Sequence, residues 1–437
     1  MHHEVIMKYN PYIFGNPVPP EKFLGRADEI KILTSRITPN LQSVAIIGEP
    51  KSGKSSILKY VFSEKNKRKL FNSFSNNITF SLVDAHSFGE TMTQSQFWER
   101  CLFPLEVKLN NTVRSSPLHE AFNVCKHNNY GSFVLERLFT MLSSQKQFLI
   151  LGIDEFDALI NHPILNKAEF FGGLRALASN LGSLALIIAS RQNLASLNNL
   201  TQEYSRQGSP YFNTLHEIHL GKFDKSTSEK ILAMGRKKFT EEDKRFLIRI
   251  SGENPYLIQA ASFLMWNEHE ANNKSHEQRR ETVTDKLFDI ASLNFKDTWK
   301  YWSPETKKVF TTIALDEAPT LLEQHTFDIN QLIKELPSYL SEIKILYKQG
   351  FIIPDKELES EWRVCPEIYI WCLADELVSV VRDAKKFEIW FRSQEWEGYF
   401  KRGEKEQLTK AGQQIALFMK DGISAFFKSY AERLTKN

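Results

Sequence analysis

Short apolar runs alternate with longer stretches of helically spaced apolar residues through the first half of the chain. The runs are rich in β-branched residues and end in polar ones, which predicts buried strands at 43–47, 78–83, 148–153, 184–189 and within 211–220. The helical spacing predicts helices after Arg26, from about Lys54, over 131–142 and over 170–179. Strands that alternate with helices need crossover connections, so the pattern predicts a parallel sheet in an α/β fold.

The pattern becomes helical beyond about residue 224. A helix is predicted over 303–313, with Ser303 as its cap and Pro304 in its first turn. Two further helices are predicted over 329–336 and 339–349. A hairpin of 351–354 and 362–365 follows Gly350. This succession of helices and a hairpin is the outline of a winged helix. The aromatic residues of 385–437 are also helically spaced, and we expect them to pack on the preceding domain or, alternatively, to form a docking surface for a partner.

Composition limits the class of protein. A chain of 437 residues with 42% hydrophobic and 25% charged residues indicates two or three globular domains. The four cysteines are scattered without a CxxC pair, which favours reduced core residues in a cytoplasmic protein. The first residues lack the apolar core of a signal peptide, and the apolar runs are too short to cross a bilayer, so we expect no membrane association.

One motif carries specific chemistry. Residues 48–55 match G-x-x-x-x-G-K-[ST] in full, between a predicted strand and a predicted helix. The glycines let the backbone wrap a phosphate, and the N–H groups of the loop and of the helix N-terminus face the anion. Lys54 is expected to pair with the β- and γ-phosphates of ATP, and the Ser55 hydroxyl to bind Mg²⁺. The nucleotide-binding residues predicted here are Gly48, Glu49, Pro50, Lys51, Ser52, Gly53, Lys54, Ser55 and Ser56.

A carboxylate pair completes the predicted site. Asp154 and Glu155 follow the buried run 148–153, at the carboxyl end of a strand, where open α/β sheets bind ligands. Asp154 is expected to hold Mg²⁺, and Glu155 to orient and polarise the attacking water. The intervening strand 78–83 suggests that another strand separates the two motif strands, as in P-loop ATPases with a catalytic glutamate.

Arginines are the third element. Arg191 follows the strand 184–189 and is predicted to sense the γ-phosphate, a role for which Ser190 and Gln192 also qualify. Arg175 and Arg206 are alternative candidates for an arginine finger supplied to a neighbouring subunit.

Several further stretches make the chain resemble one family. They are Asn10-Pro11, Phe23-Leu24-Gly25-Arg26, Asp154-Glu155-Phe156-Asp157, Ala189-Ser190-Arg191, Ser209-Pro210-Tyr211-Phe212-Asn213 and Gly252-Glu253-Asn254-Pro255-Tyr256-Leu257-Ile258-Gln259. Together they resemble prokaryotic STAND and archaeal-type ATPases of the AAA+, origin-recognition-like group, over roughly residues 10–380. The resemblance implies that Pro255, in a helical lid, approaches the adenine or ribose and that Gly25 and Arg26 border the adenine. It also implies nucleotide-dependent oligomerisation and a winged helix after the lid.

These observations predict four regions. They are a P-loop ATPase domain with its lead-in (1–223), a helical lid (224–298), a winged helix (299–384) and a helical tail (385–437). Unlike larger members of the family, the chain shows no long repeat array and no fused effector enzyme.

The charges weigh against DNA binding through the predicted winged helix. Residues 337–365 carry four basic residues against five acidic ones, and phosphate contacts supply most non-specific DNA affinity. The net charge of +3 on the whole chain neither demands nor excludes nucleic acid. A basic run at 65–69 could touch nucleic acid from another face, although such a run is more often a solvated loop.

Three functions follow as hypotheses. The favoured one is an ATP-hydrolysing switch whose nucleotide state controls oligomerisation or engagement of a protein partner, with defence or signalling as the role expected from the resemblance. The alternative is a DNA-associated AAA+ ATPase, such as a loader or a regulator of transposition. The least favoured is a degenerate protein that binds ATP without turnover, because Lys54, Ser55, Asp154 and Glu155 are all present.

Overall fold

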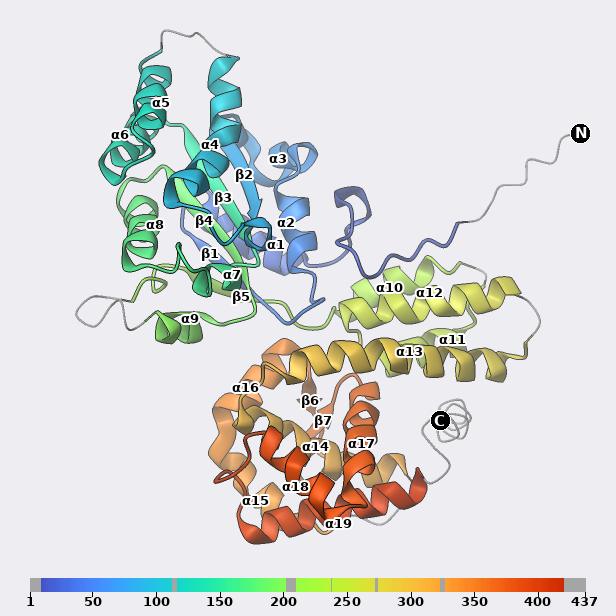
Figure 1. Ribbon diagram of the computed structural model, residues 1–437. Helices are drawn as coiled ribbons and strands as arrows, with labels where there is room; N and C mark the ends of the chain where they lie inside the picture. Colours follow the sequence, from blue (N-terminus) through green and yellow to red (C-terminus); the bar gives the residue numbers. More distant parts are fainter. Residues whose placement is uncertain are drawn as a thin grey trace, which may run out of the picture. The chain divides into compact units, whose positions relative to one another are not determined.

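The computed structural model describes residues 9–111, 116–201, 210–236, 238–271, 274–322 and 327–419. The chain forms two compact units, whose elements are labelled in Figure 1. The first unit comprises Pro17–Glu49 and Gly53–Leu220, and the second comprises Met1–Asn16, Pro50–Ser52 and Gly221–Asn437.

A five-stranded parallel sheet forms the centre of the first unit, with the order β2-β3-β4-β1-β5. The strands are β1 (Val44–Ile47), β2 (Ile78–Asp84), β3 (Phe148–Asp154), β4 (Leu184–Ser190) and β5 (His216–His219). All five predicted strands are confirmed. Every residue of β1 and β4 is buried, which explains why these strands read as continuous apolar runs instead of alternating ones.

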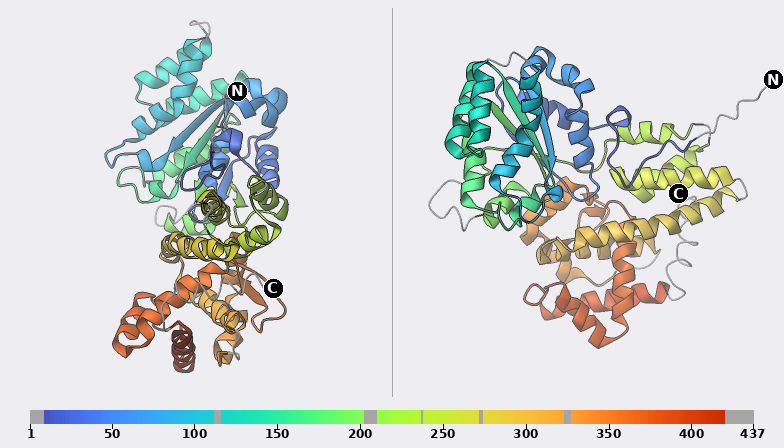
Figure 2. Two further views of the ribbon diagram at one scale, coloured as in Figure 1. Left: turned by 90° about the vertical axis from the view of Figure 1, so that its right-hand side faces the viewer. Right: turned by 45° about the horizontal axis from the view of Figure 1, so that its top comes forward.

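Helices cover both faces of this sheet (Figure 2). One apolar core joins the sheet to α1 (Ala27–Ile37), α2 (Lys54–Val61) and α3 (Glu64–Phe71). The core on the other face includes residues of α4 (Gln94–Asn110), α5 (Pro117–His127), α6 (Ser132–Ser144), α7 (Asp157–Ile160), α8 (Ala168–Asn180) and α9 (Leu194–Leu200). The unit is therefore a three-layer α/β/α sandwich, and the predicted α/β fold with a parallel sheet is confirmed. A short 3₁₀ helix, Pro20–Lys22, precedes α1, and two more, Asn72–Asn77 and Ala85–Ser87, flank β2.

Two predictions about this unit need correction. A strand does separate β1 from β3, but it is β4; the strand at 78–84 lies beyond β3 at the edge of the sheet. Crossover connections allow a strand to be placed on either side of its predecessor, so order along the chain does not fix lateral order. The basic run at 65–69 is not a loop but part of helix α3, which Phe71 anchors in the core with 1% of its surface exposed.

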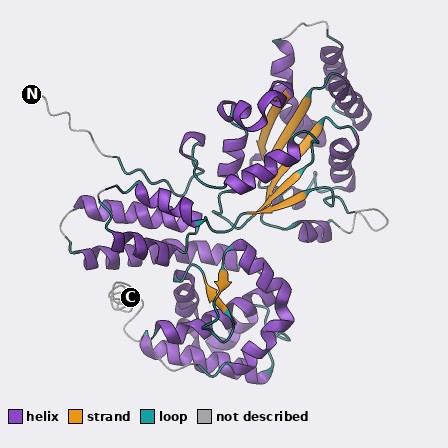
Figure 3. Ribbon diagram, turned by 180° about the vertical axis from the view of Figure 1, so that it is seen from behind, coloured by secondary structure: helices purple, strands orange, loops and turns teal. Residues whose placement is uncertain are grey.

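Apart from loops and one hairpin, the described part of the second unit is helical (Figure 3). Its first helices are α10 (Lys225–Ala233), α11 (Glu241–Ser251), α12 (Pro255–Ala271) and α13 (His276–Trp299). They are followed by α14 (Pro304–Leu321), α15 (Asn330–Glu335), the 3₁₀ helix Leu336–Tyr339 and α16 (Leu340–Gln349). The antiparallel pair β6 (Ile352–Pro354) and β7 (Trp362–Val364) comes next, before α17 (Ile368–Val381), α18 (Ala384–Ser393) and α19 (Arg402–Phe418). The predicted order of three helices and a hairpin is confirmed, and the Ser303 side chain caps α14 by accepting the Thr306 N–H.

Three aromatic side chains of the described tail, Phe387, Phe391 and Trp396, pack inward. Phe391 and Trp396 are buried, and the Trp396 ring meets that of Trp299 at a centroid distance of 6.4 Å. The Trp299 indole donates to Gln394 Oε1 at 2.6 Å. The described part of the tail, to residue 419, therefore packs on the preceding helices as expected. Among the residues that the structure covers, no helix has both the length and the apolar character needed to cross a bilayer.

Gly152 provides a test of the sheet packing. A Cβ at this position of β3 would lie 2.6 Å from Cζ of Phe62 and 2.8 Å from Cδ1 of Leu82. Gly152→Ala should therefore lower the free energy of unfolding by about 1–3 kcal/mol, measured by chemical denaturation. Gly173→Ala in α8 is the matched control, because its Cβ meets no atom within 4 Å. Equal denaturation midpoints for the two variants would contradict this packing.

Candidate nucleotide site

The phosphate loop connects the end of β1 to the start of α2. Gly53 has φ +101° and precedes the first residue of α2, Lys54. A Cβ on Gly53 would meet nothing within 4 Å, so the glycine is needed for its backbone conformation and not for lack of space. Lys51 also has a positive φ, of 67°. These turns bring the chain round to the N-terminus of α2, whose N–H groups are suited to bind an anion.

Lys54 is the charge at the centre of the site. Only 5% of its surface is exposed, and Nζ donates to the carbonyl oxygens of Gly48 at 2.7 Å and Glu49 at 3.1 Å. Burial lowers the pKa of the ammonium group. The carboxylates of Glu155, Glu49 and Asp157 act against this lowering of the pKa, and Arg191 adds to it. The predicted residues Lys54, Glu155 and Arg191 thus lie near enough to interact electrostatically.

Asp154 is the last residue of β3, and Glu155 follows it in the left-handed conformation with φ +50°. The Glu155 N–H donates to Asp154 Oδ1 at 3.0 Å. A non-glycine residue in this conformation costs about 1 kcal/mol or more, and such residues concentrate at functional sites. The chain therefore turns sharply between two carboxylates at the carboxyl edge of the sheet.

Asp157 has a role that the sequence did not reveal. Its carboxylate accepts the Ser190 hydroxyl at 3.0 Å, the Arg191 N–H at 2.9 Å and the Gln192 N–H at 3.2 Å. The end of β4 is thereby fixed to the turn that carries Glu155. The available signal was a third acid in Asp154-Glu155-Phe156-Asp157, two residues after the proposed catalytic glutamate.

The lead-in segment packs against α2. The Phe23 ring stacks on Tyr60 at 4.5 Å, and the Val18 N–H donates to the Ser56 hydroxyl at 3.0 Å. Gly25 and Arg26 both have positive φ, and Arg26 precedes α1 and pairs with Glu29 at 2.9 Å. The segment predicted to border the adenine therefore lies beside the helix that follows the phosphate loop. Contact of Gly25 and Arg26 with the base stays a prediction.

The other predicted residues are grouped with the second unit, lie on α8 or fall outside the described residues. Pro255 belongs to the second unit, where it is buried as the first residue of α12. Pro50, Lys51 and Ser52 are also grouped with that unit. Arg175 lies on α8 and is half-buried, and Arg206 lies outside the described residues. The roles of Pro255 and of the arginine finger therefore stay predictions.

The oxygen donors suit Mg²⁺. Ser55 in the first turn of α2 offers a hydroxyl and Asp154 a carboxylate, and Mg²⁺ is usually bound by one or two such groups together with water and substrate phosphates. In the described ranges, no group of three or more His, Cys, Asp and Glu residues could hold a metal ion. A metal held mainly by nucleotide phosphates is compatible with that finding.

Comparison with known proteins identifies the fold. No protein-family model and no curated protein sequence matches the chain. Among solved structures, the Walker-type ATPase PABY2304 of Pyrococcus abyssi aligns with a TM-score of 0.50 and 14% identity, covering 81% of this chain and 97% of that one. The ORC2 protein of Aeropyrum pernix aligns with a TM-score of 0.45 and 14% identity, over 80% of this chain and 95% of that one. Identities this low establish shared fold alone. The chain therefore shares its fold with the Walker-type ATPase PABY2304, and residues 48–55 carry the phosphate-loop motif in that fold.

Asp157→Asn tests the link between β4 and the catalytic turn. The amide keeps one acceptor oxygen but replaces the other with a donor, so the end of β4 should shift. We expect kcat for ATP to fall about 10- to 100-fold while KM changes less than about threefold. Asp297→Asn, at an exposed position in α13, is the control. An unchanged kcat, or a loss of kcat that follows only a lower melting temperature, would contradict the positioning role.

Proposed function

We propose that this chain is an ATP-hydrolysing switch, in which turnover times a conformational or assembly state. The observation that carries the proposal is the single charged cluster around the buried Lys54. It includes the phosphate loop, the Asp154-Glu155 turn and Arg191, the residue that follows β4. These are the parts that phosphoryl transfer to water requires: a phosphate cradle, a water-positioning carboxylate and a cation for the γ-phosphate.

Each residue has a distinct part in the proposed reaction. The loop N–H groups and Lys54 bind the β- and γ-phosphates, and Ser55 and Asp154 hold Mg²⁺. The metal ion, when bound, neutralises charge on the phosphate oxygens. Glu155 accepts a hydrogen bond from the attacking water and orients it toward the γ-phosphorus. Arg191, its backbone fixed by Asp157, offers a positive charge to the γ-phosphate.

Contacts inside the second unit support a switch over a simple hydrolase. Gly252, in the turn that the resemblance assigns to nucleotide contact, has φ +56°, and a Cβ there would lie 2.5 Å from Cα of Pro366. The Cys365 thiol donates to the Gly252 carbonyl at 3.2 Å, and Arg249 Nε pairs with Glu367 at 3.2 Å. Residues 365–367 directly follow β7. A movement of the Gly252–Pro255 turn would therefore be passed to the hairpin.

The second unit can also be divided into regions. We infer that 224–298 is a lid, that 299–384 is a winged helix and that 385–437 extends it. The winged helix is supported by the order α14–α15–α16–β6–β7. We further infer a STAND-type role, with a homo-oligomer or a protein effector as the partner, since the motif resemblance implies assembly that depends on nucleotide.

Glu155→Gln tests the hydrolytic switch. The amide should leave ATP binding intact but lower kcat at least about 100-fold, since the water loses its acceptor. Size-exclusion chromatography with ATP should then show an altered assembly state, whereas Lys54→Ala should abolish both turnover and the change. Glu229→Gln, at an exposed position in α10, is the control. Full turnover in Glu155→Gln would refute the catalytic assignment, and unchanged assembly and partner binding would refute the switch.

DNA association is the second candidate function. It is favoured by the exposed side chains of Lys344, Tyr347 and Lys348 on α16, the helix before the hairpin. Arg363 of β7 is instead engaged by Asp355 at 2.7 Å and Glu317 at 3.4 Å. A gel shift on duplex DNA with ATP, repeated over a salt series, tests this function with Lys344→Gln and Lys348→Gln as variants. Absence of binding at low salt would exclude it.

A further inference from the structure

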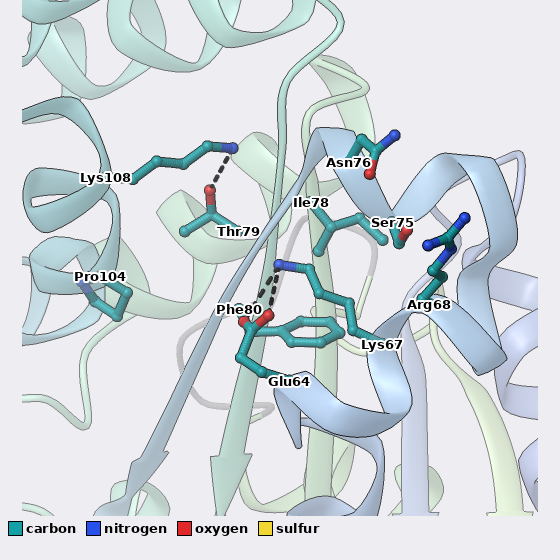
Figure 4. A pocket seen from close by; sticks show the side chains of 10 residues that line it. All are labelled: Glu64, Lys67, Arg68, Ser75, Asn76, Ile78, Thr79, Phe80, Pro104 and Lys108. Atoms are coloured by element: carbon teal, nitrogen blue, oxygen red, sulfur yellow. Dashed lines mark hydrogen bonds and ion pairs between the residues drawn. The ribbon is translucent and has the colours of Figure 1, made fainter. Parts of the chain in front are cut away.

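A second basic pocket lies in the first unit, away from the phosphate loop (Figure 4). It has a volume of about 470 Å³ and is built from α3, the 3₁₀ helix Asn72–Asn77, the start of β2, and α4. Ile78 pairs in parallel register with Phe148, the first residue of β3, whereas Asp84 pairs with Asp154. Six residues of strand, roughly 20 Å, therefore separate the start of β2 from the catalytic edge.

Three cations line the pocket. Lys67 and Arg68 come from α3, and Lys108 comes from α4 on the other side of β2 (Figure 4). Lys108 Nζ donates to Thr79 Oγ1 at 3.3 Å and to Gln147 Oε1 at 2.8 Å, so neutral oxygens hold it in place. Burial and the positive charge of Lys67 both lower the pKa of Lys108. These cations from separate elements are therefore close enough to repel each other.

Negative charge in the pocket is limited to one residue of its lining. Glu64 pairs with Lys67 at 3.2 Å, but 74% of its side chain is exposed, whereas the Lys67 side chain is 17% exposed. Within the described ranges, Arg68 has no ion pair. Both oxygens of Glu64 accept from Lys67 Nζ, at 3.2 and 3.3 Å, but water screens an ion pair whose carboxylate is this exposed, so the carboxylate opposes an anion only weakly.

The remaining lining provides polar groups and an apolar floor. Asn76 and Thr79 offer amide and hydroxyl donors, whereas the Ser75 hydroxyl donates to the Asn72 carbonyl. Phe80, with 8% of its surface exposed, and Ile78 form the floor, and the Lys67 ammonium lies 5.0 Å from the centre of the Phe80 ring. Cations and neutral donors above an apolar surface form a suitable site for a compact anion with several oxygens.

We propose that this pocket is a second anion site, which binds a phosphate group independently of the ATP site. Lys67, Arg68 and Lys108 supply the charge, and Thr79 and Asn76 supply neutral donors. The phosphate belongs either to a small phosphorylated molecule or to the backbone of a single-stranded nucleic acid. Both sources present the same phosphate chemistry. Lys65 and Lys69 lie on α3 but outside the pocket lining, so an extended nucleic acid could contact them and a small molecule in the pocket could not.

The test uses the full chain and two probes, inorganic pyrophosphate followed by calorimetry and a fluorescent single-stranded oligonucleotide followed by anisotropy. Each probe is titrated into the wild type and into Lys54→Ala, which removes the phosphate-loop contribution. In the Lys54→Ala background, Arg68→Gln and Lys108→Gln should each weaken binding about tenfold. Arg68→Gln is the cleaner variant, because this side chain has no ion pair to lose. Basal ATP turnover of the single pocket variants should stay unchanged.

Glu64→Gln gives a test in the opposite direction. Removing the one carboxylate of the lining should strengthen binding about two- to fivefold, a gain that damage to the fold would not produce. Lys65→Gln is the matched control on the same helix. If it leaves pyrophosphate binding unchanged and only pyrophosphate binds, the ligand is a small phosphorylated molecule. If only the oligonucleotide binds, and Lys65→Gln weakens it, the phosphate comes from nucleic acid. The proposal would be overturned if binding disappeared in Lys54→Ala, or if substitution of Arg68, Lys108 and Glu64 left the affinity unchanged.

Discussion

The burial of one ammonium group constrains much of the first unit. Lys54 has 5% of its surface exposed, and a buried charge is stable only when hydrogen bonds and opposite charges surround it. The loop carbonyls of Gly48 and Glu49 meet the first requirement. The second is met by Glu155 and Asp157, which lie at the end of another strand. Strands β1, β3 and β4 must therefore end at one edge, and the buried parallel sheet achieves this.

Helices and strands could be predicted from the sequence because burial imposes a pattern of apolar residues on it. β1 and β4 are buried on both faces, so their sequences are uninterrupted apolar runs. The phosphate loop was predictable for a related reason: its backbone needs glycine at defined positions, and Gly53 at φ +101° meets that need. Burial of a strand and the backbone conformation of a loop can therefore be recognised from a short stretch of sequence.

Long-range relations were not predictable in the same way. Asp157 bonds to Ser190, Arg191 and Gln192, more than thirty positions away, and no spacing rule marks such a partner. The lateral position of β2 depends on the direction of crossovers and not on its own residues. The run at 65–69 was expected to be a loop, because its charges conceal Phe71, which anchors helix α3 in the core. The pocket beside it combines residues from α3 and α4, which single stretches of sequence could not show.

The aromatic packing of the tail has an optical consequence. Of the eight tryptophans in the chain, only Trp98 lies in the first unit, where it is fully buried against Phe97 and Phe139. The other seven, including Trp299 and Trp396, belong to the second unit. Intrinsic fluorescence therefore reports mainly on the helical unit, whereas the phosphate-loop lysine and the proposed catalytic carboxylates lie in the other. The sequence thus contains its own fluorescent label for the unit that does not hold the proposed catalytic residues.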